Sequence, residues 1–206
     1  MIEFKILIVE DEPLIAEDIA FVLKKNDYHV SGIAYYEEDA YVELEKNPDM
    51  VLLDINLNGI QSGIRIAEII NEKYQLPFIY LTSYSDKYTI EKAKHTEPSG
   101  YLVKPFSDAG LYSAIEIALF NHAQKIKQKF PELSLSIINK HLQQPISDRE
   151  FELLNLIYNG KTNQQIADTM FISVNTVKKH INHIYLKIES TSRTQTMNRL
   201  RELMKK

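Results

Sequence analysis

The feature that most constrains the fold is a strict alternation of short apolar runs with longer segments of helical period across residues 1–120. The runs predict five strands, Lys5–Val9, Tyr28–Ala34, Met50–Leu53, Phe78–Leu81 and Tyr101–Val103. Residues 13–25, residues 63–73 and the segment from Ser107 onward carry apolar residues at helical spacing. This alternation indicates βα units, and therefore a doubly wound α/β domain with a five-stranded parallel sheet.

Composition limits the class of protein. The chain has 206 residues, of which 44% are hydrophobic, and it has no cysteine. A packed core is therefore expected, while disulfides and thiolate chemistry are excluded. The first residues are too acidic for a signal peptide, and no apolar run approaches the roughly 18 residues of a membrane span. We expect a cytoplasmic protein with no membrane partner.

Charge divides the chain into two parts. Residues 1–120 hold 10 lysines and arginines against 21 acidic residues, a net charge of −11. Residues 121–206 hold 14 against 7, a net charge of +7. The split predicts two domains with different partners, and the basic part makes nucleic acid a candidate.

Polar side chains follow four of the five predicted strands. They are Glu10-Asp11, Asp54, Thr82-Ser83 and Lys104-Pro105. Because the carboxyl ends of parallel strands lie at one edge of the sheet, we expect these residues to meet where open α/β folds bind ligands.

The chemistry of this group is restrictive. Three clustered carboxylates repel one another and need a cation, and their hard oxygen atoms favour Mg²⁺. Lys104 suits a phosphoryl oxygen, and the Thr82 hydroxyl can donate to another. This combination predicts that Asp54 is a nucleophile that accepts phosphate as an acyl phosphate.

With these residues in place, residues 1–120 resemble the receiver domain of two-component response regulators. The resemblance implies a flavodoxin-like fold with strand order 2-1-3-4-5 and a cis Lys104–Pro105 bond. It also implies a histidine kinase as phosphodonor and Tyr101 as the switch residue. The implied Mg²⁺ ligands are Asp11, Asp54 and the Asn56 carbonyl, with Glu10 assisting.

An aspartyl-phosphate phosphatase of the haloacid-dehalogenase type uses a similar set of residues. That chemistry needs a second aspartate two residues after the nucleophile as general acid. Asn56 occupies this position and cannot fill that role. The sequence therefore favours a long-lived phosphorylated state over catalytic turnover, and we expect no enzyme activity.

Residues 147–206 predict a small all-α domain of four helices. Capping boxes begin at Ser147 and Thr162, while Ser173 and Ser192 precede the third and fourth helices. Gly160 ends the first helix. The short second helix, about 163–170, and the tight turn after it indicate a helix-turn-helix motif.

The third helix has two faces. Val177, Ile181, Ile184 and Ile188 form an apolar stripe that should be buried. The opposite face carries Asn175, Lys178, Lys179, Asn182 and His183, and it is a candidate for reading the major groove of double-stranded DNA. Leu186 also falls on this polar face, and the sequence does not explain it.

The matches in this half are spread over residues 147–200, which are similar to the LuxR-type (NarL/FixJ) DNA-binding domain. They are Ser147-x-Arg149-Glu150, Gly160-x-x-Asn163, Ile166-Ala167, Ile172-Ser173, Thr176-Val177-Lys178-x-His180, Ile184, Lys187 and Arg193. The resemblance implies that Lys178, Lys179 and Asn182 face bases, while Thr176, Lys187 and Arg193 contact phosphate or serve the scaffold. The last helix, with Met197, Leu200 and Met204, resembles a dimer-forming helix.

Residues 121–146 are expected to link the two domains. Ala123, Ile126 and Phe130 continue the spacing of Leu119, so the preceding helix should run to about Lys129 and stop at Pro131. The combined interpretation is a regulator whose phosphorylation at Asp54 controls homodimerisation and promoter binding. The alternative is a DNA-binding regulator that is not phosphorylated and uses the receiver domain only to form dimers.

Overall fold

A computed structural model describes residues 4–83, 87–129 and 132–204 of the chain. It divides into two compact units, Phe4–Ala118 and Leu119–Lys206 together with residues 1–3. Each unit has its own hydrophobic core.

The first unit is a five-stranded parallel sheet with strand order β2-β1-β3-β4-β5. The strands are β1 (Lys5–Val9), β2 (His29–Ala34), β3 (Met50–Asp54), β4 (Phe78–Thr82) and β5 (Gly100–Val103). Residues of β3 and β4 are buried throughout, as their unbroken apolar runs predicted. The predicted fold class and strand order are confirmed.

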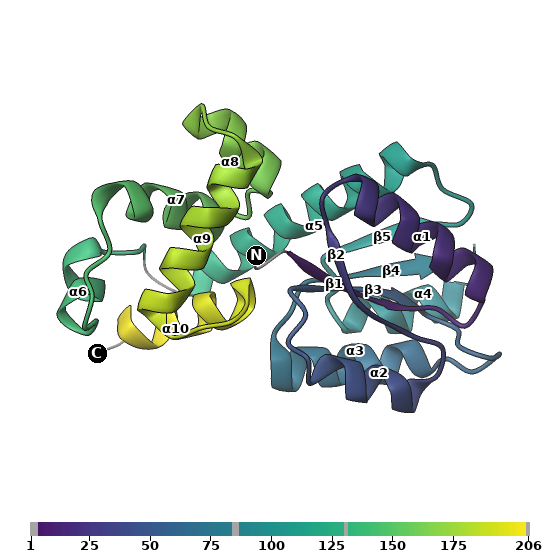
Figure 1. Cartoon of the computed structure of the whole chain (residues 1–206). Helices are drawn as coiled ribbons and strands as arrows, with labels where there is room; N and C mark the ends of the chain where they lie inside the picture. Colours follow the sequence, from purple (N-terminus) through teal and green to yellow (C-terminus); the bar gives the residue numbers. More distant parts are fainter. Residues whose placement is uncertain (1–3, 84–86, 130–131, 205–206) are drawn as a thin grey trace. The chain divides into compact units, whose positions relative to one another are not determined.

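Helices cover both faces of the sheet, with α1 and α5 on one side and α2, α3 and α4 on the other (Figure 1). Their bounds are α1 (Pro13–Lys25), α2 (Glu37–Leu44), α3 (Ser62–Ile69), α4 (Lys87–His95) and α5 (Asp108–Lys129). The helix predicted over residues 63–73 is divided, because a π-helical turn (Ile70–Tyr74) follows α3. That turn closes at Gln75, whose left-handed backbone (φ 54°) lets its N–H donate to the Ile70 carbonyl at 2.7 Å.

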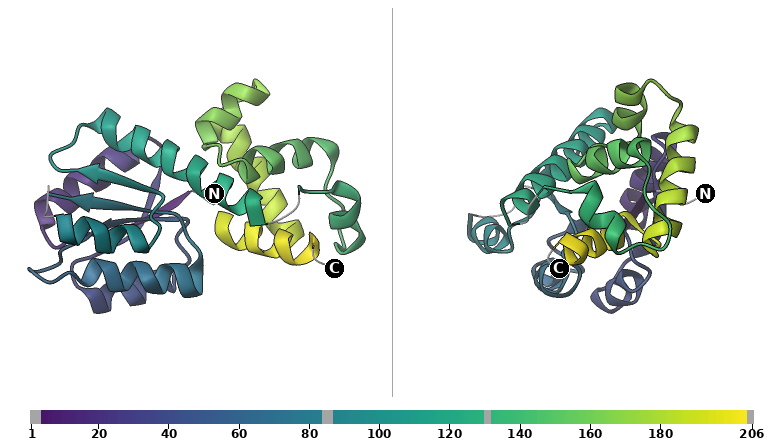
Figure 2. Two further views of the ribbon diagram at one scale, coloured as in Figure 1. Left: turned by 180° about the vertical axis from the view of Figure 1, so that it is seen from behind. Right: turned by 90° about the vertical axis from the view of Figure 1, so that its left-hand side faces the viewer.

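The second unit contains a helical domain, seen from two further sides in Figure 2. Its helices are α6 (Leu135–Lys140), α7 (Asp148–Tyr158), α8 (Asn163–Met170), α9 (Val174–Ile188) and α10 (Arg193–Met204). Helix α5 reaches Lys129, as predicted, whereas the predicted stop at Pro131 lies outside the described residues.

Local sequence fixes the helix starts of this unit. Ser147 and Thr162 form the two predicted capping boxes, with Glu150 and Gln165 at the third helical positions. Ser173 accepts from the Thr176 amide at the start of α9. Gly160, two residues after α7, has the predicted left-handed backbone with φ 78°.

Candidate functional site

The site residues predicted from the sequence stand at neighbouring strand ends. Glu10 follows β1 directly, Asp54 ends β3, Thr82 ends β4, and Lys104 follows β5. These four strands are adjacent in the sheet, and Asp54 pairs in register with Leu81 as Thr82 does with Val103. Parallel topology therefore brings together residues separated by up to 94 positions in the chain.

Three carboxylates form the centre of the site. Glu10, Asp11 and Asp54 each place one oxygen within 4.8 Å of the others. Glu10 is fully buried and Asp54 is 7% exposed. Burial raises the pKa of Glu10, an effect that contacts with Lys104 oppose and the nearby charge of Asp54 reinforces. The cluster offers hard oxygen donors close together, which is the donor set that Mg²⁺ prefers.

Lys104 bridges two of these carboxylates. Its Nζ lies 2.5 Å from Glu10 Oε2 and 2.5 Å from Asp54 Oδ2, and its side chain is 8% exposed. Burial opposes the charged form, but the contacts with Asp54 and Glu10 outweigh it and raise the pKa of Lys104. The peptide bond to Pro105 is cis, as the family resemblance implied.

Backbone amides of the loop after β3 donate hydrogen bonds to two of the carboxylates. The backbone N–H of Asn56 donates to Asp54 Oδ1 at 3.0 Å, and the backbone N–H of Asn58 donates to Asp11 Oδ2 at 2.8 Å. Asn58 was not among the predicted site residues. Its Asn58-Gly59 pair is a turn signal that could have found it, since both residues have positive φ.

Gly63, in the first turn of α3, is a second residue that sequence reasoning missed. A Cβ at this position would lie 2.0 Å from the Asp54 carbonyl oxygen and 2.9 Å from Ile55 Cα. The Gly63 amide donates to the Ile55 carbonyl at 3.2 Å. The absence of a side chain therefore lets α3 approach the backbone of the central aspartate.

Thr82 and Tyr101 complete the predicted set. Thr82 is 6% exposed at the end of β4. Tyr101 lies on edge strand β5, is 40% exposed, and has its ring centroid 5.7 Å from that of Tyr80. Burial of part of the ring raises the pKa of Tyr101.

The second unit contains the predicted helix-turn-helix. Helix α8 ends at Met170, and the next residue, Phe171, has a left-handed backbone (φ 56°) that turns the chain sharply toward α9. The apolar stripe of α9 is buried as predicted, with Val177, Ile181, Ile184 and Ile188 at most 5% exposed. Asn175, Lys179 and His183 are exposed on the other side, and Asn182 and Thr176 are partly exposed.

Comparison with known proteins assigns both units. Residues 6–116 match the family model of the response regulator receiver domain, and residues 144–199 match that of the LuxR family of bacterial regulatory proteins. The chain belongs to the response regulator family. It carries a receiver domain and a LuxR-type DNA-binding domain, and regulators of this kind interact with histidine kinases and DNA.

Relatives align with this chain over nearly its whole length. This response regulator is 29% identical over 198 residues to the transcriptional regulatory protein LiaR of Bacillus subtilis, covering 93% of each chain. It is 26% identical over 200 residues to the response regulator protein VraR of Staphylococcus aureus, covering 94% of each. Its receiver resembles the solved receiver domain of a modulated diguanylate cyclase from Desulfovibrio desulfuricans, with 34% identity and a TM-score of 0.54. That match covers 60% of this chain and 97% of the other.

One predicted base-facing residue of the regulator is not on the exposed face. Lys178 is only 4% exposed. It lies one helical turn before Ile181 and two turns before Tyr185, both of which are buried. The buried arc of α9 is therefore wider than the single predicted stripe, and Lys178 falls inside it.

Two further predicted DNA contacts are engaged within the domain. Lys187 Nζ lies 2.7 Å from Glu150 Oε2 and donates to the Pro145 carbonyl at 2.9 Å. Arg193 is 7% exposed, and one of its terminal nitrogens donates to the Ile157 and Lys161 carbonyls at 3.0 and 2.6 Å. Each of the two residues therefore ties its helix to backbone elsewhere in the domain.

Helix α10 is the one that resembles a dimer-forming helix by its sequence. Its Met197 and Leu200 side chains are 8% and 0% exposed and belong to the core of their own domain. Met204 packs against the same core.

Among the helices that the structure describes, none is both long and apolar enough to cross a bilayer.

Proposed function

We propose that this response regulator is switched by phosphorylation of Asp54, with a histidine kinase as donor. The observation that carries the proposal is the position of Lys104, whose ammonium group touches Asp54 and Glu10 at the edge where Asp11 also converges. This arrangement places a fixed cation beside an acidic nucleophile, as phosphoryl transfer requires.

The transfer exchanges one bond for another. An Asp54 carboxylate oxygen attacks the phosphorus of a phosphohistidine, the P–O bond forms, and the P–N bond breaks with the electron pair returning to the imidazole. Lys104 and the Thr82 hydroxyl then contact the oxygens of the phosphoryl group. Asp11, Asp54 and the Asn56 carbonyl would hold Mg²⁺ with assistance from Glu10, and the ion would offset the charge of phosphate and carboxylates.

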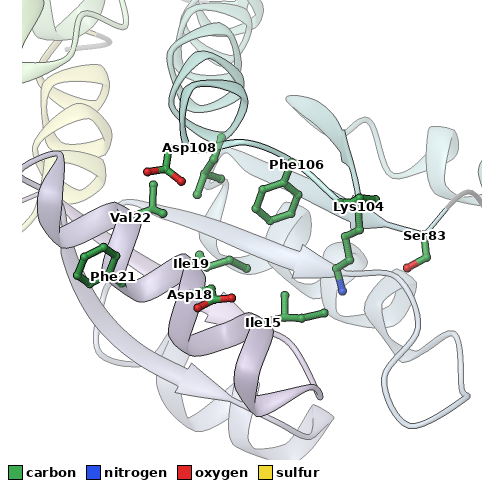
Figure 3. Close-up of a pocket in the computed structure, with 11 residues that line it drawn as sticks. Ile15, Asp18, Ile19, Phe21, Val22, Ser83, Lys104, Phe106 and Asp108 are labelled. Atoms are coloured by element: carbon green, nitrogen blue, oxygen red, sulfur yellow. The ribbon is translucent and has the colours of Figure 1, made fainter.

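A groove beside Lys104 suits the approach of a kinase. It has a volume of about 480 Å³ and lies between α1 and the segment that leads from β5 into α5. Ile15 and Ile19 line it from α1, and Phe106 lines it from the other side (Figure 3). We propose that the apolar face of a kinase helix occupies this groove and so presents its histidine to Asp54.

Phosphorylation would act on the DNA-binding domain by shifting an existing equilibrium. In this proposal, Thr82 and Tyr101 respond to the phosphoryl group, and the altered receiver surface favours a homodimer. Asn175, Thr176, Lys179, Asn182 and His183 then form the face of α9 that contacts bases and phosphates. Two such faces in a dimer would bind half-sites about one helical turn of DNA apart.

Labelling with a small acyl phosphate and Mg²⁺ tests the proposal. Intact-mass spectrometry should show one added phosphoryl group on the wild type and none on Asp54→Ala. The matched control is Asp39→Asn, at an exposed position of α2, which should label like the wild type. An unlabelled wild type would refute the switch, and continuous phosphate release at enzymatic rates would support the phosphatase.

DNA binding separates the switch from the alternative of a receiver used only for dimerisation. If labelling controls the output, the affinity of the wild type for DNA should rise with phosphodonor while that of Asp54→Ala does not. The alternative would be favoured if the affinity for DNA were the same with and without phosphodonor and the protein were a dimer in both conditions.

A further inference from the structure

Leu186 stands on the exposed side of α9. Its exposed fraction is 76%, although the opposite side of the same helix is the core of the domain. Single exposed apolar residues are common on protein surfaces, so exposure alone assigns it no role. Its position around the helix is more informative.

Helical geometry places Leu186 at the centre of the polar face. At about 100° per residue, it lies within roughly 20° of both Asn175 and Lys179 around the helix axis. It is about 180° from Val177, which is fully buried. Because Lys178 belongs to the buried arc, the exposed face is centred on the line through Asn175, Lys179 and Leu186.

The position along the axis is compatible with a contact to DNA. Leu186 is seven residues beyond Lys179, which corresponds to about 10 Å along the axis of α9. If α9 lies in the major groove as proposed above, both side chains point into the same groove. The surrounding Lys179, Asn182 and His183 provide charge and hydrogen-bonding groups suited to that environment.

We infer that Leu186 is a specificity-determining residue that contacts the C5-methyl group of a thymine. This inference rests on the proposed DNA-binding role of α9. The thymine methyl is the apolar group that base edges present in the major groove, and it is the feature that a leucine can recognise. Phosphate oxygens, in contrast, offer nothing that an aliphatic side chain can bind.

Deoxyuridine tests the contact because it removes the methyl group and keeps the pairing edge. The full chain, labelled with a small acyl phosphate, would first select its site from random duplexes. Each thymine of the selected half-site would then be replaced singly by deoxyuridine. At one position the wild type should lose about three- to fivefold in affinity, the factor that corresponds to burying one methyl group.

Leu186→Ala should bind thymine and deoxyuridine at that position equally. Leu14→Ala is the matched control, since Leu14 is a similarly exposed leucine (78%) in the receiver, and it should keep the wild-type preference. Neither change should alter the melting temperature by more than a few degrees, because both side chains are exposed.

Several results would overturn the inference. They are an equal deoxyuridine effect in wild type and Leu186→Ala, a selected half-site with no methyl-sensitive thymine, and a uniform loss of affinity for all sequences. If Leu186→Ala no longer formed the dimer that the wild type forms, the residue would instead be assigned to contact with a second copy of the chain. Failure of the DNA-binding role itself would look different, since Lys179→Ala would then bind the selected duplex as well as the wild type does.

Discussion

Replacing Gly63 by alanine should damage the phosphoacceptor site through the backbone, without touching any of its functional side chains. The new Cβ would lie 2.0 Å from the Asp54 carbonyl oxygen. An ordinary carbon–oxygen contact is about 3.4 Å or longer, so α3 or the end of β3 must move by more than about 1 Å. Such a movement also stretches the hydrogen bond from the Gly63 amide to the Ile55 carbonyl.

The net cost can be assembled from three contributions. Overpacking a rigid site costs about 1–3 kcal/mol, and loss of one hydrogen bond costs about 0.5–1.5 kcal/mol. Alanine regains up to about 1 kcal/mol because it is the better helix former. We therefore expect Gly63→Ala to lower the free energy of unfolding of the receiver by about 0.5–4.5 kcal/mol and to slow labelling of Asp54.

Gly110→Ala provides the matched control. Gly110 also stands in the first turn of a receiver helix, but its added Cβ would meet only the Ser107 hydroxyl oxygen, at 3.3 Å. The Ser107 hydroxyl accepts from the Gly110 amide at 3.1 Å and would have to shift by only a few tenths of an ångström. The gain in helix propensity and the weakened cap should nearly cancel, so the free energy of unfolding of this variant should stay within about 1 kcal/mol of the wild type. Urea unfolding followed by circular dichroism measures both variants. A Gly63→Ala protein as stable and as readily labelled as Gly110→Ala would refute the steric reasoning.

Three further changes test the second unit, Leu119–Lys206. Burial would raise the pKa of Glu150, but contacts with Lys187 and Ser147 outweigh burial and lower that pKa. The ionised carboxylate therefore stabilises the fold above pH 4.5, the ordinary pKa of the group, and this stabilisation is lost as pH falls. Wild type should therefore lose more stability than Glu150→Gln between about pH 5 and pH 3, and parallel curves would contradict this. Burial, then the charges of Arg201 and Lys125, lower the pKa of the partly buried His122 to about 3. As pH falls, the imidazole therefore takes up a proton in the unfolded chain before it does so in the folded protein. Between pH 7.5 and pH 5.5 the wild type should lose about 1 kcal/mol of unfolding free energy, measured by thermal unfolding, that His122→Gln does not lose. An equal loss in both proteins would show that His122 is solvated in the folded protein. Arg193→Met should destabilise the domain by about 2–4 kcal/mol in urea, because a buried carbonyl (Ile157) and a partly buried one (Lys161) lose their charged donor. A neutral result would show that water replaces the guanidinium group.

The receiver site could be predicted because topology converts local patterns into spatial neighbours. Each strand is recognisable by its apolar run, and the residue after it must lie at the carboxyl edge once the sheet is parallel. Asp54 and Lys104 therefore needed no contact information to be placed together. Gly63 and Asn58 escaped prediction because their roles depend on how closely a loop and a helix approach β3, which the apolar pattern does not encode.

The DNA-binding domain shows where such reasoning stops. The apolar stripe of α9 fixes the centre of its buried arc, but the edges of the arc are set by neighbouring elements. Lys178 lies about 90° from the centre of the stripe, where either burial or exposure is compatible with the helix pattern, and the structure buries it. Leu186 lies opposite the centre of the stripe, and the structure leaves it 76% exposed. The helix pattern therefore indicates the side on which Leu186 lies, and what that exposed leucine contacts depends on what the face of α9 binds.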